Sequence, residues 1–210
     1  VIGVISALTI PQLITSHQAT QAKARFNTAY SMISEAIANM ESDEVSTNPA
    51  RYGYNKFYET FKNYFKISVD CGGASSGGTN KDNCIIYGNE ASYNYLIKTG
   101  TNNMNHEILD NGAFVTSNGM LFMIENYPSR NPYLGLLISV DINGKNKRPN
   151  RYGWDLFTFE LIDGDVIPVG ADGTTYSEWR TPENYCNDTS TDTFNGVTCS
   201  YYAVNDPEYF

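Results

Sequence analysis

The sequence predicts an α+β fold, in which a long N-terminal helical stem packs against an antiparallel β-sheet head with disulfide-closed C-terminal loops. Three observations predict it. No Lys, Arg, Asp or Glu occurs before Lys23. Strand-like runs separated by short connections begin at Met120, and four cysteines form two pairs of equal spacing. We therefore expect a stem over residues 1–40 and a globular head over residues 41–210.

The stem is expected to be one helix with two different halves. In its second half apolar side chains recur at three- and four-residue steps, which indicates an amphipathic helix that ends near Met40. These residues are Ala22, Phe26, Ala29, Tyr30, Ile33, Ile37 and Met40. A straight helix of about 40 residues is about 60 Å long. Because the first half is apolar all round, it must find a partner outside its own head.

The head begins with a region rich in Tyr, Asn and Gly, where we expect a short helix over residues 54–65. Four strands are expected over residues 120–127, 133–141, 154–161 and 165–170. Phe157 and Phe159 alternate with Thr158 and Glu160, which is the period of a half-buried strand. Short connections favour an antiparallel meander whose one apolar face covers the stem. Residues 172–210 are expected to be irregular.

The cysteines are separated by thirteen positions in each pair, Cys71 with Cys84 and Cys186 with Cys199. Four cysteines allow three connectivities, and we favour the local one, because each pair closes a polar loop that has no core residues of its own. Each such disulfide contributes roughly 3 kcal/mol on the chain-entropy model. Disulfides imply an oxidising, extracytoplasmic compartment, and free thiols are the alternative.

Charge and motifs exclude several classes of function. The net charge is −9, and residues 160–210 hold ten acidic residues and one basic residue. This acidity argues against binding of a nucleic-acid backbone and indicates a solvated face, with cation binding as the alternative. No catalytic motif is present, and His17 and His106 form no visible pair with a carboxylate. We expect no enzymatic activity.

One loop is a candidate calcium site. Asp141, Asn143 and Gly144 place alternate oxygen ligands before a glycine turn, and Asp155 is a later ligand, but the glutamate of an EF-hand is missing. The alternative is a tight turn in which Asp141 and Asp155 accept hydrogen bonds from backbone amides. Further acids are Asp163, Asp165 and Asp172. Asn187 begins a glycosylation sequon.

Two stretches resemble the type IV pilins and the type II secretion pseudopilins. VIGVISALTIPQL is similar to their hydrophobic N-terminal helix, with Gly3 and Pro11 where that family has a glycine and a proline. VDINGKNKRPNRYGWDLFTFEL, residues 140–161, resembles a motif of many prepilin-type proteins, with one extra residue before the proline. Mature members begin about ten residues earlier, on a methylated aromatic residue with a glutamate nearby. We therefore expect this sequence to be a truncated mature subunit.

The resemblance implies a structural subunit of an extracellular filament on the bacterial cell surface, which serves adhesion, motility or DNA uptake. Its partners would be identical subunits in a helical homopolymer, the inner membrane before assembly, and the pilus assembly machinery. The residues expected in the filament core are Val1, Ile2, Gly3, Val4, Ile5, Leu8, Ile10, Pro11, Leu13 and Ile14. The chain between Gly3 and Pro11 is expected to unwind in the filament.

Two other functions are alternatives. The first is a pseudopilin of a type II secretion system, in which the filament pushes exoproteins outward. Pseudopilins of the major type bind calcium, so this resemblance also implies Ca²⁺ as a ligand. The second is a monomeric, membrane-anchored protein whose head binds a ligand in a calcium-dependent way. Sedimentation separates them, because filaments pellet and anchored monomers in detergent do not.

Overall fold

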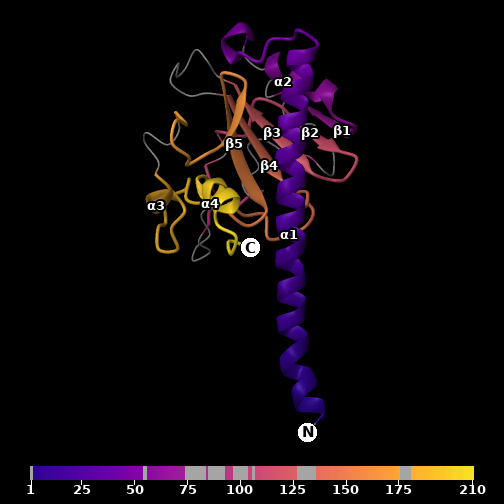
Figure 1. Ribbon diagram of the computed structural model, residues 1–210, viewed down its shortest axis with the longest axis vertical. Coiled ribbons are helices and arrows are strands. Elements are labelled where there is room, and N and C mark those ends of the chain that lie inside the picture. The colour runs from indigo at the N-terminus through magenta and orange to yellow at the C-terminus, as the bar shows by residue number, and fades with distance from the viewer. Residues whose placement is uncertain are drawn as a thin grey trace.

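The fold is given by a computed structural model (Figure 1). It describes residues 2–53, 56–73, 84, 93–96, 104–105, 107–126, 136–175 and 181–210, with side chains from residue 17 onward. A long helix stands beside a sheet-containing head and projects far beyond it, so that the N-terminus lies at the tip of a stalk. The α+β class with a helical stem and an antiparallel sheet is confirmed.

The stem is α1, Ile2–Ser42, a single helix of 41 residues. It runs without interruption through Gly3 and Pro11, so the unwinding expected in a filament is not present in the single chain. The helix ends two residues later than expected. Glu44 there adopts a left-handed φ of 57°, and the Val45 amide donates to the Met40 carbonyl at 2.8 Å.

Short helical turns follow the stem at the end of the head farthest from the N-terminus. They are η1 (Pro49–Arg51), α2 (Lys56–Phe61) and η2 (Lys62–Tyr64). The helix expected over residues 54–65 is therefore confirmed from residue 56, and residues 54 and 55 lie outside the described residues. Phe57 and Phe61 of α2 are fully buried, and their rings pack 5.3 Å apart. This burial explains why so short a helix is stable.

Within the described residues the sheet has six strands in sequence order, each antiparallel to its neighbours. They are β1 (Ile67–Gly72), β2 (Ala113–Thr116), β3 (Leu121–Glu125), β4 (Leu136–Asp141), β5 (Leu156–Ile162) and β6 (Asp165–Pro168). The last four are the expected meander. The first two were not predicted, because β2 is only four residues long and β1 breaks its register twice against it.

The expectation of a single apolar sheet face was wrong. One core lies between α1 and the sheet and includes Phe26, Ile33 and Phe157. A second core covers the opposite face and includes Leu156 and Val197. Hence β5 is buried on both faces, including its polar residues. On the second face Thr158 bonds Ser139 at 2.8 Å, and the buried Glu160 accepts a hydrogen bond from the Thr175 hydroxyl.

The C-terminal segment is more ordered than expected. It forms α3 (Pro182–Tyr185) and α4 (Cys199–Asn205), which correct the expectation of an irregular tail. The Thr158 amide of β5 donates to the Ser200 hydroxyl of α4 at 2.8 Å. α4 therefore closes the second core over β5. The sequence did not predict α4, because only Cys199, Ser200 and Ala203 of the seven residues of this helix are buried, too few for a periodic pattern.

Both local disulfides are present as predicted. Cys71–Cys84 links β1 to the following segment with a Cα–Cα distance of 5.7 Å, and Cys186–Cys199 links the end of α3 to the start of α4 at 4.9 Å. Both Cα–Cα distances are within the usual range. The polar loop of the first pair, residues 74–83, lies outside the described residues.

Candidate functional site: the stem and the β4–β5 loop

The second half of α1 is held to the head by aromatic packing. Phe26 lies with its ring centroid 4.8 Å from that of Phe157, edge to face, and 5.6 Å from that of Phe210 at the C-terminus. Tyr30 stacks on Phe159 at 5.1 Å. Contacts of this kind contribute beyond the apolar area that they bury. The amphipathic stripe predicted for this half is therefore its head-facing side, and the last residue of the chain completes it.

Three hydrogen bonds tie polar side chains of the stem to the head backbone. Lys23 donates to the Pro207 carbonyl at 2.8 Å, Arg25 to the Ile142 carbonyl at 3.0 Å, and the Tyr30 hydroxyl to the Val166 carbonyl at 3.2 Å. Lys23 and Arg25 are two helical positions apart, so they point to nearly opposite sides of α1. The stem thus leaves the head between the C-terminal segment and the β4–β5 loop.

The stem projects beyond this point. His17 and Gln18 are exposed, and Phe26 is the first fully buried residue of α1 from His17 onward, where side chains are described. Of the residues expected in a filament core, Val1 lies outside the described residues. For Ile2, Gly3, Val4, Ile5, Leu8, Ile10, Pro11, Leu13 and Ile14 only the helical backbone is described. Figure 1 shows this part of α1 extending away from the head. Across the described side chains, no helix is long and apolar enough to cross a bilayer.

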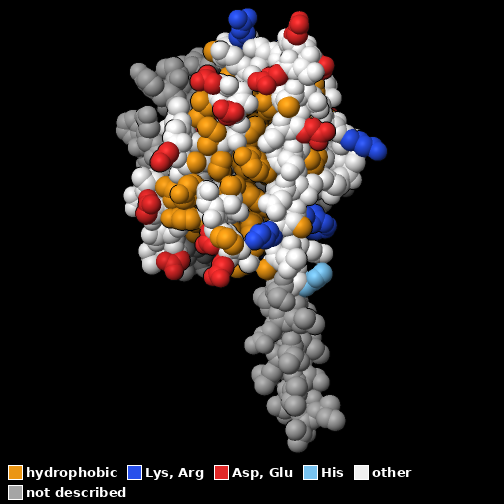
Figure 2. Space-filling model, viewed as in Figure 1, with side chains coloured by type: hydrophobic (Ala, Val, Ile, Leu, Met, Phe, Trp, Pro, Cys, Tyr) orange, Lys and Arg blue, Asp and Glu red, His pale blue; other side chains and the backbone are white. Residues whose placement is uncertain are grey.

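A groove lies beside the stem near the far end of the head. It has a volume of about 510 Å³ and runs between α1, from Tyr30 to Glu41, and the edge strand β6 with its preceding turn. Figure 2 shows apolar side chains gathered beside the stem on this face. Exposed Asp163 and Asp165 lie at the turn that enters β6. One flank of the stem is therefore only partly covered by its own head.

The β4–β5 loop is organised by two buried carboxylates. Asp141 Oδ1 accepts hydrogen bonds from the Asn143 amide at 3.0 Å and the Gly144 amide at 2.7 Å, and Oδ2 accepts one from the Tyr93 hydroxyl. Gly144 has a φ of +84°, and a side chain there would meet the Gly119 carbonyl oxygen. The Asp141 carboxylate therefore holds a bend at Asn143 and Gly144 through backbone amides, as in the alternative to calcium that the sequence offered. The backbone turn that follows joins the Lys147 amide to the Gly144 carbonyl at 2.8 Å.

Asp155 closes the other end of the same loop. Its Oδ2 accepts from the Asn150 amide at 2.7 Å and from Asn143 Nδ2 at 3.2 Å, and its Oδ1 accepts from the Arg151 amide at 2.6 Å. The strand expected from residue 154 thus begins only at Leu156. The structure brings Asp141, Asn143 and Asp155 together as the sequence predicted, and it joins them by hydrogen bonds to loop amides.

Burial raises the pKa of Asp141 to about 7, and the charge of Asp155 adds to this, while the hydrogen bonds from Tyr93, Asn143 and Gly144 oppose it. Burial also raises the pKa of Asp155. The negative charge of one carboxylate therefore disfavours ionisation of the other within the same loop. The sequence did not reveal Tyr93, whose buried hydroxyl reaches Asp141 from 48 positions away.

As a calcium site this loop has few uncommitted ligands. The carboxylate oxygens of Asp141 and Asp155 already accept five hydrogen bonds from Asn143, Gly144, Asn150 and Arg151. Within the described residues, Asn143 Oδ1 and Asn150 Oδ1 are buried oxygens without a hydrogen-bond partner, and no cluster of three His, Cys, Asp or Glu residues suits a metal. To bind here, calcium would have to displace these amides or use the two free amide oxygens.

The other candidate residues lie elsewhere. Asp163 and Asp165 follow β5, whereas Asp155 precedes it, so a strand of about 20 Å separates them from the loop. Asp172 is exposed in the turn after β6. His17 is exposed on α1, and His106 lies outside the described residues. The Asn187 side chain accepts from Thr189 and donates to the Glu183 carbonyl.

No family model, curated protein or solved structure matches this chain. The features that indicate a function are therefore the projecting stem, the β4–β5 loop that contacts it and the sequence motifs of residues 1–13 and 140–161.

Proposed function

We propose that this chain is the structural subunit of a type IV pilin-like filament and that it assembles through its N-terminal helix. The observation that carries the proposal is the division of α1. From Phe26 onward the helix is buried against the head, whereas the preceding part projects beyond it. Up to Ile14 the residues of the projecting part are apolar except for Ser6, Thr9 and Gln12. Such a surface needs a partner, and copies of the same helix supply a matching one.

The head has features that suit repeated side-by-side packing. The open groove beside α1 leaves one flank of the stem accessible to a neighbour. Exposed acidic residues such as Asp163, Asp172 and Asp188 give the head a charged surface. Two disulfides and a sheet buried on both faces make it rigid without help from the stem tip. Heterologous contacts, in which two different surfaces of the subunit meet, generate helical filaments when they do not close into a ring. A stem that projects from one side of the head is suited to contacts of this kind.

The experiment that tests this proposal is site-specific photo-crosslinking in cells that make the full-length protein. A photoreactive amino acid at Ile10 should give a ladder of covalent multimers in the sheared surface fraction, because stems are neighbours in the filament core. The same group at Arg51, exposed at the opposite end of the head, is the matched control and should give no stem-to-stem product. Material that stays monomeric with both probes would contradict the proposal and favour an anchored monomer.

A further inference from the structure

The β4–β5 loop is basic in an acidic protein. Between Asp141 and Asp155 it contains Lys145, Lys147, Arg148 and Arg151 and no acidic residue, although the chain has a net charge of −9. The two aspartates at its ends are buried and hydrogen-bonded within the loop. Lys145 donates to the Cys84 carbonyl. Lys147 and Arg148 are exposed and have no ion pair with a described residue.

The same loop presents an exposed tryptophan. The side chain of Trp154 is 57% exposed, and with Val204 it is one of the two exposed large apolar residues of the described part of the chain. The Arg151 guanidinium lies 5.5 Å from the Trp154 ring, as in a cation–π contact. Tryptophan beside basic residues is the combination found where proteins meet lipid headgroups.

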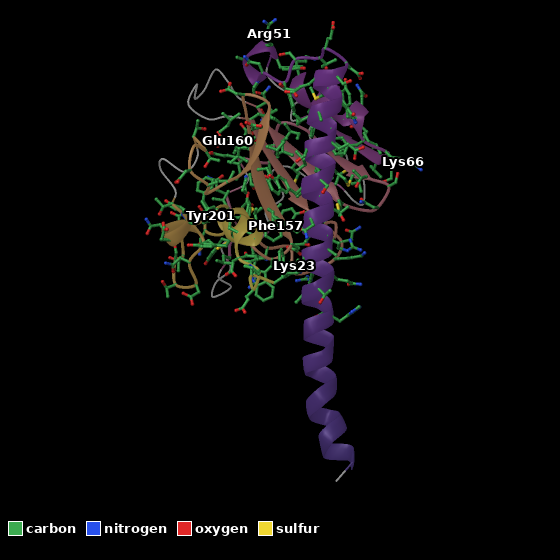
Figure 3. All side chains as sticks on the ribbon, viewed as in Figure 1. Lys23, Arg51, Lys66, Phe157, Glu160 and Tyr201 are labelled. Carbon is green, nitrogen blue, oxygen red and sulfur yellow. A yellow bond between two sulfur atoms is a disulfide. The ribbon has the colours of Figure 1, made fainter. Side chains whose placement is uncertain are left out.

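The loop lies where the stem leaves the head. Arg25 of α1 donates to the Ile142 carbonyl at its start, and the Tyr209 hydroxyl donates to the Gly153 carbonyl near its end at 2.6 Å. Figure 2 shows basic side chains on both sides of the stem at this level, and Figure 3 labels Lys23 there, with Arg51 at the opposite end of the head. The loop therefore lies at the end of the head from which the stem projects.

The stem sequence sets the distance from this loop to a bilayer. Residues 1–14 are apolar except for Ser6, Thr9 and Gln12, and residues 15–21 are mostly polar but carry no formal charge. The loop contacts α1 at Arg25, eleven residues beyond Ile14, which is about 16 Å along the helix, and the headgroup region on each side of a bilayer takes about 5–7 Å of this. If the apolar residues lie in the hydrocarbon, the start of the β4–β5 loop lies about 10 Å from the anionic phosphates, which is about one Debye length.

We propose that the loop formed by residues 143–154 docks the head onto anionic phospholipid headgroups while the subunit resides in the membrane. This inference rests on the proposed function, because it concerns the membrane-held subunit before assembly. The loop contacts the stem through Arg25, and the stem is the part of the subunit that would lie in the bilayer. This proximity favours a bilayer over an acidic neighbouring subunit or a nucleic acid. Docking is expected on one side of the stem only. On the Lys23 side the C-terminal segment carries exposed Asp206 and Glu208, which anionic lipids repel, so the head tilts toward the Arg25 side, where the β4–β5 loop lies.

The test uses the full chain reconstituted in vesicles, with Trp179→Phe leaving Trp154 as the single tryptophan. Energy transfer from Trp154 to a dansyl headgroup lipid reports docking. Transfer should be higher on vesicles with phosphatidylglycerol than on phosphatidylcholine alone, and it should fall with salt. The neutralised variant Lys147→Gln/Arg148→Gln should reduce the ratio of docked to undocked heads about 30-fold, at about 1 kcal/mol per charge. Arg51→Gln/Lys66→Gln removes the same charge elsewhere on the head and should behave like the parent.

Equal transfer on both lipid compositions, or equal losses in the two double variants, would overturn the inference. A loop variant that still docks but no longer forms filaments would assign the loop to a neighbouring subunit. Single-stranded DNA that binds the loop more tightly than anionic vesicles would assign it to a nucleic acid. Docking by a chain that never forms filaments would refute the proposed function alone, and filaments from a chain that never docks would refute this inference alone.

Discussion

At the scale of single residues, Phe26 is the point where the stem becomes part of the head. Its ring is 1% exposed and contacts Phe157, Phe159 and Phe210. We expect Phe26→Ala to lower the free energy of unfolding by about 3–5 kcal/mol, since it leaves a cavity between the stem, β5 and Phe210. Chemical denaturation measures this. Asn27→Ala, next to it on the exposed side, should change stability little, and equal effects would contradict the assignment of the buried stripe.

The buried Asp141 predicts a pH dependence. Because its pKa is raised to about 7, the folded protein retains a proton that the unfolded chain releases, so its contribution to stability declines as pH rises from about 4 to about 7. Relative to the wild type, Asp141→Asn should therefore gain stability between pH 5 and pH 8. Tyr93→Phe removes a hydrogen bond to the carboxylate, so its loss of stability should be greater at pH 8 than at pH 5. If the free energy of unfolding changed with pH in the same way in all three proteins, the raised pKa of Asp141 would be refuted.

At the scale of elements, the two disulfides have the same sequence separation but different surroundings. Cys199 begins α4, which covers β5 through Ser200, whereas Cys71 lies in the edge strand β1. Replacing Cys186 and Cys199 with Ala should lower the free energy of unfolding by roughly 3 kcal/mol from chain entropy and by more from loosening α4. Replacing Cys71 and Cys84 is the matched control. A larger loss for the control pair would contradict the role given to α4.

The β4–β5 loop predicts a result for metal addition and removal. Its carboxylates are already satisfied by amides, so millimolar Ca²⁺ or a chelator should leave the Tm of the head unchanged. Differential scanning calorimetry checks this. A rise in Tm with Ca²⁺ that disappears in Asp155→Asn would show that the ion displaces these amides, and the loop would then be the calcium site that the resemblance implies.

The elements that could be predicted from sequence are those with a strong local pattern. The stripe from Phe26 to Met40 and the alternation along β5 mark their elements directly. The spacing of Asp141, Asn143 and Asp155 also placed one loop correctly. β1, β2 and α4 were missed because they are short and their burial depends on distant partners such as Thr158. Tyr93 and Phe210 were missed for the same reason, since only the tertiary fold brings them to Asp141 and Phe26.

At the scale of the whole molecule, the apolar stem tip and the charged surface of the head are separated. The stem tip carries no formal charge, a basic loop with an exposed tryptophan contacts the stem where it meets the head, and acidic residues dominate the last quarter of the chain. This arrangement suits a subunit that is first held in a membrane by its stem and then moved into a filament with its head outward. We expect filaments to sediment from cells that make the full-length protein and to be lost in Ile10→Asp, which places a charge in the stem core.

If copies of the projecting stem bury one another, cryo-electron microscopy of the particles formed by the full-length protein should show a helical filament. In it the N-terminal helices bundle along the axis and the heads face outward. Discrete single particles in which the helix folds back onto its own head, or filaments with the helices dispersed at the periphery, would contradict this prediction.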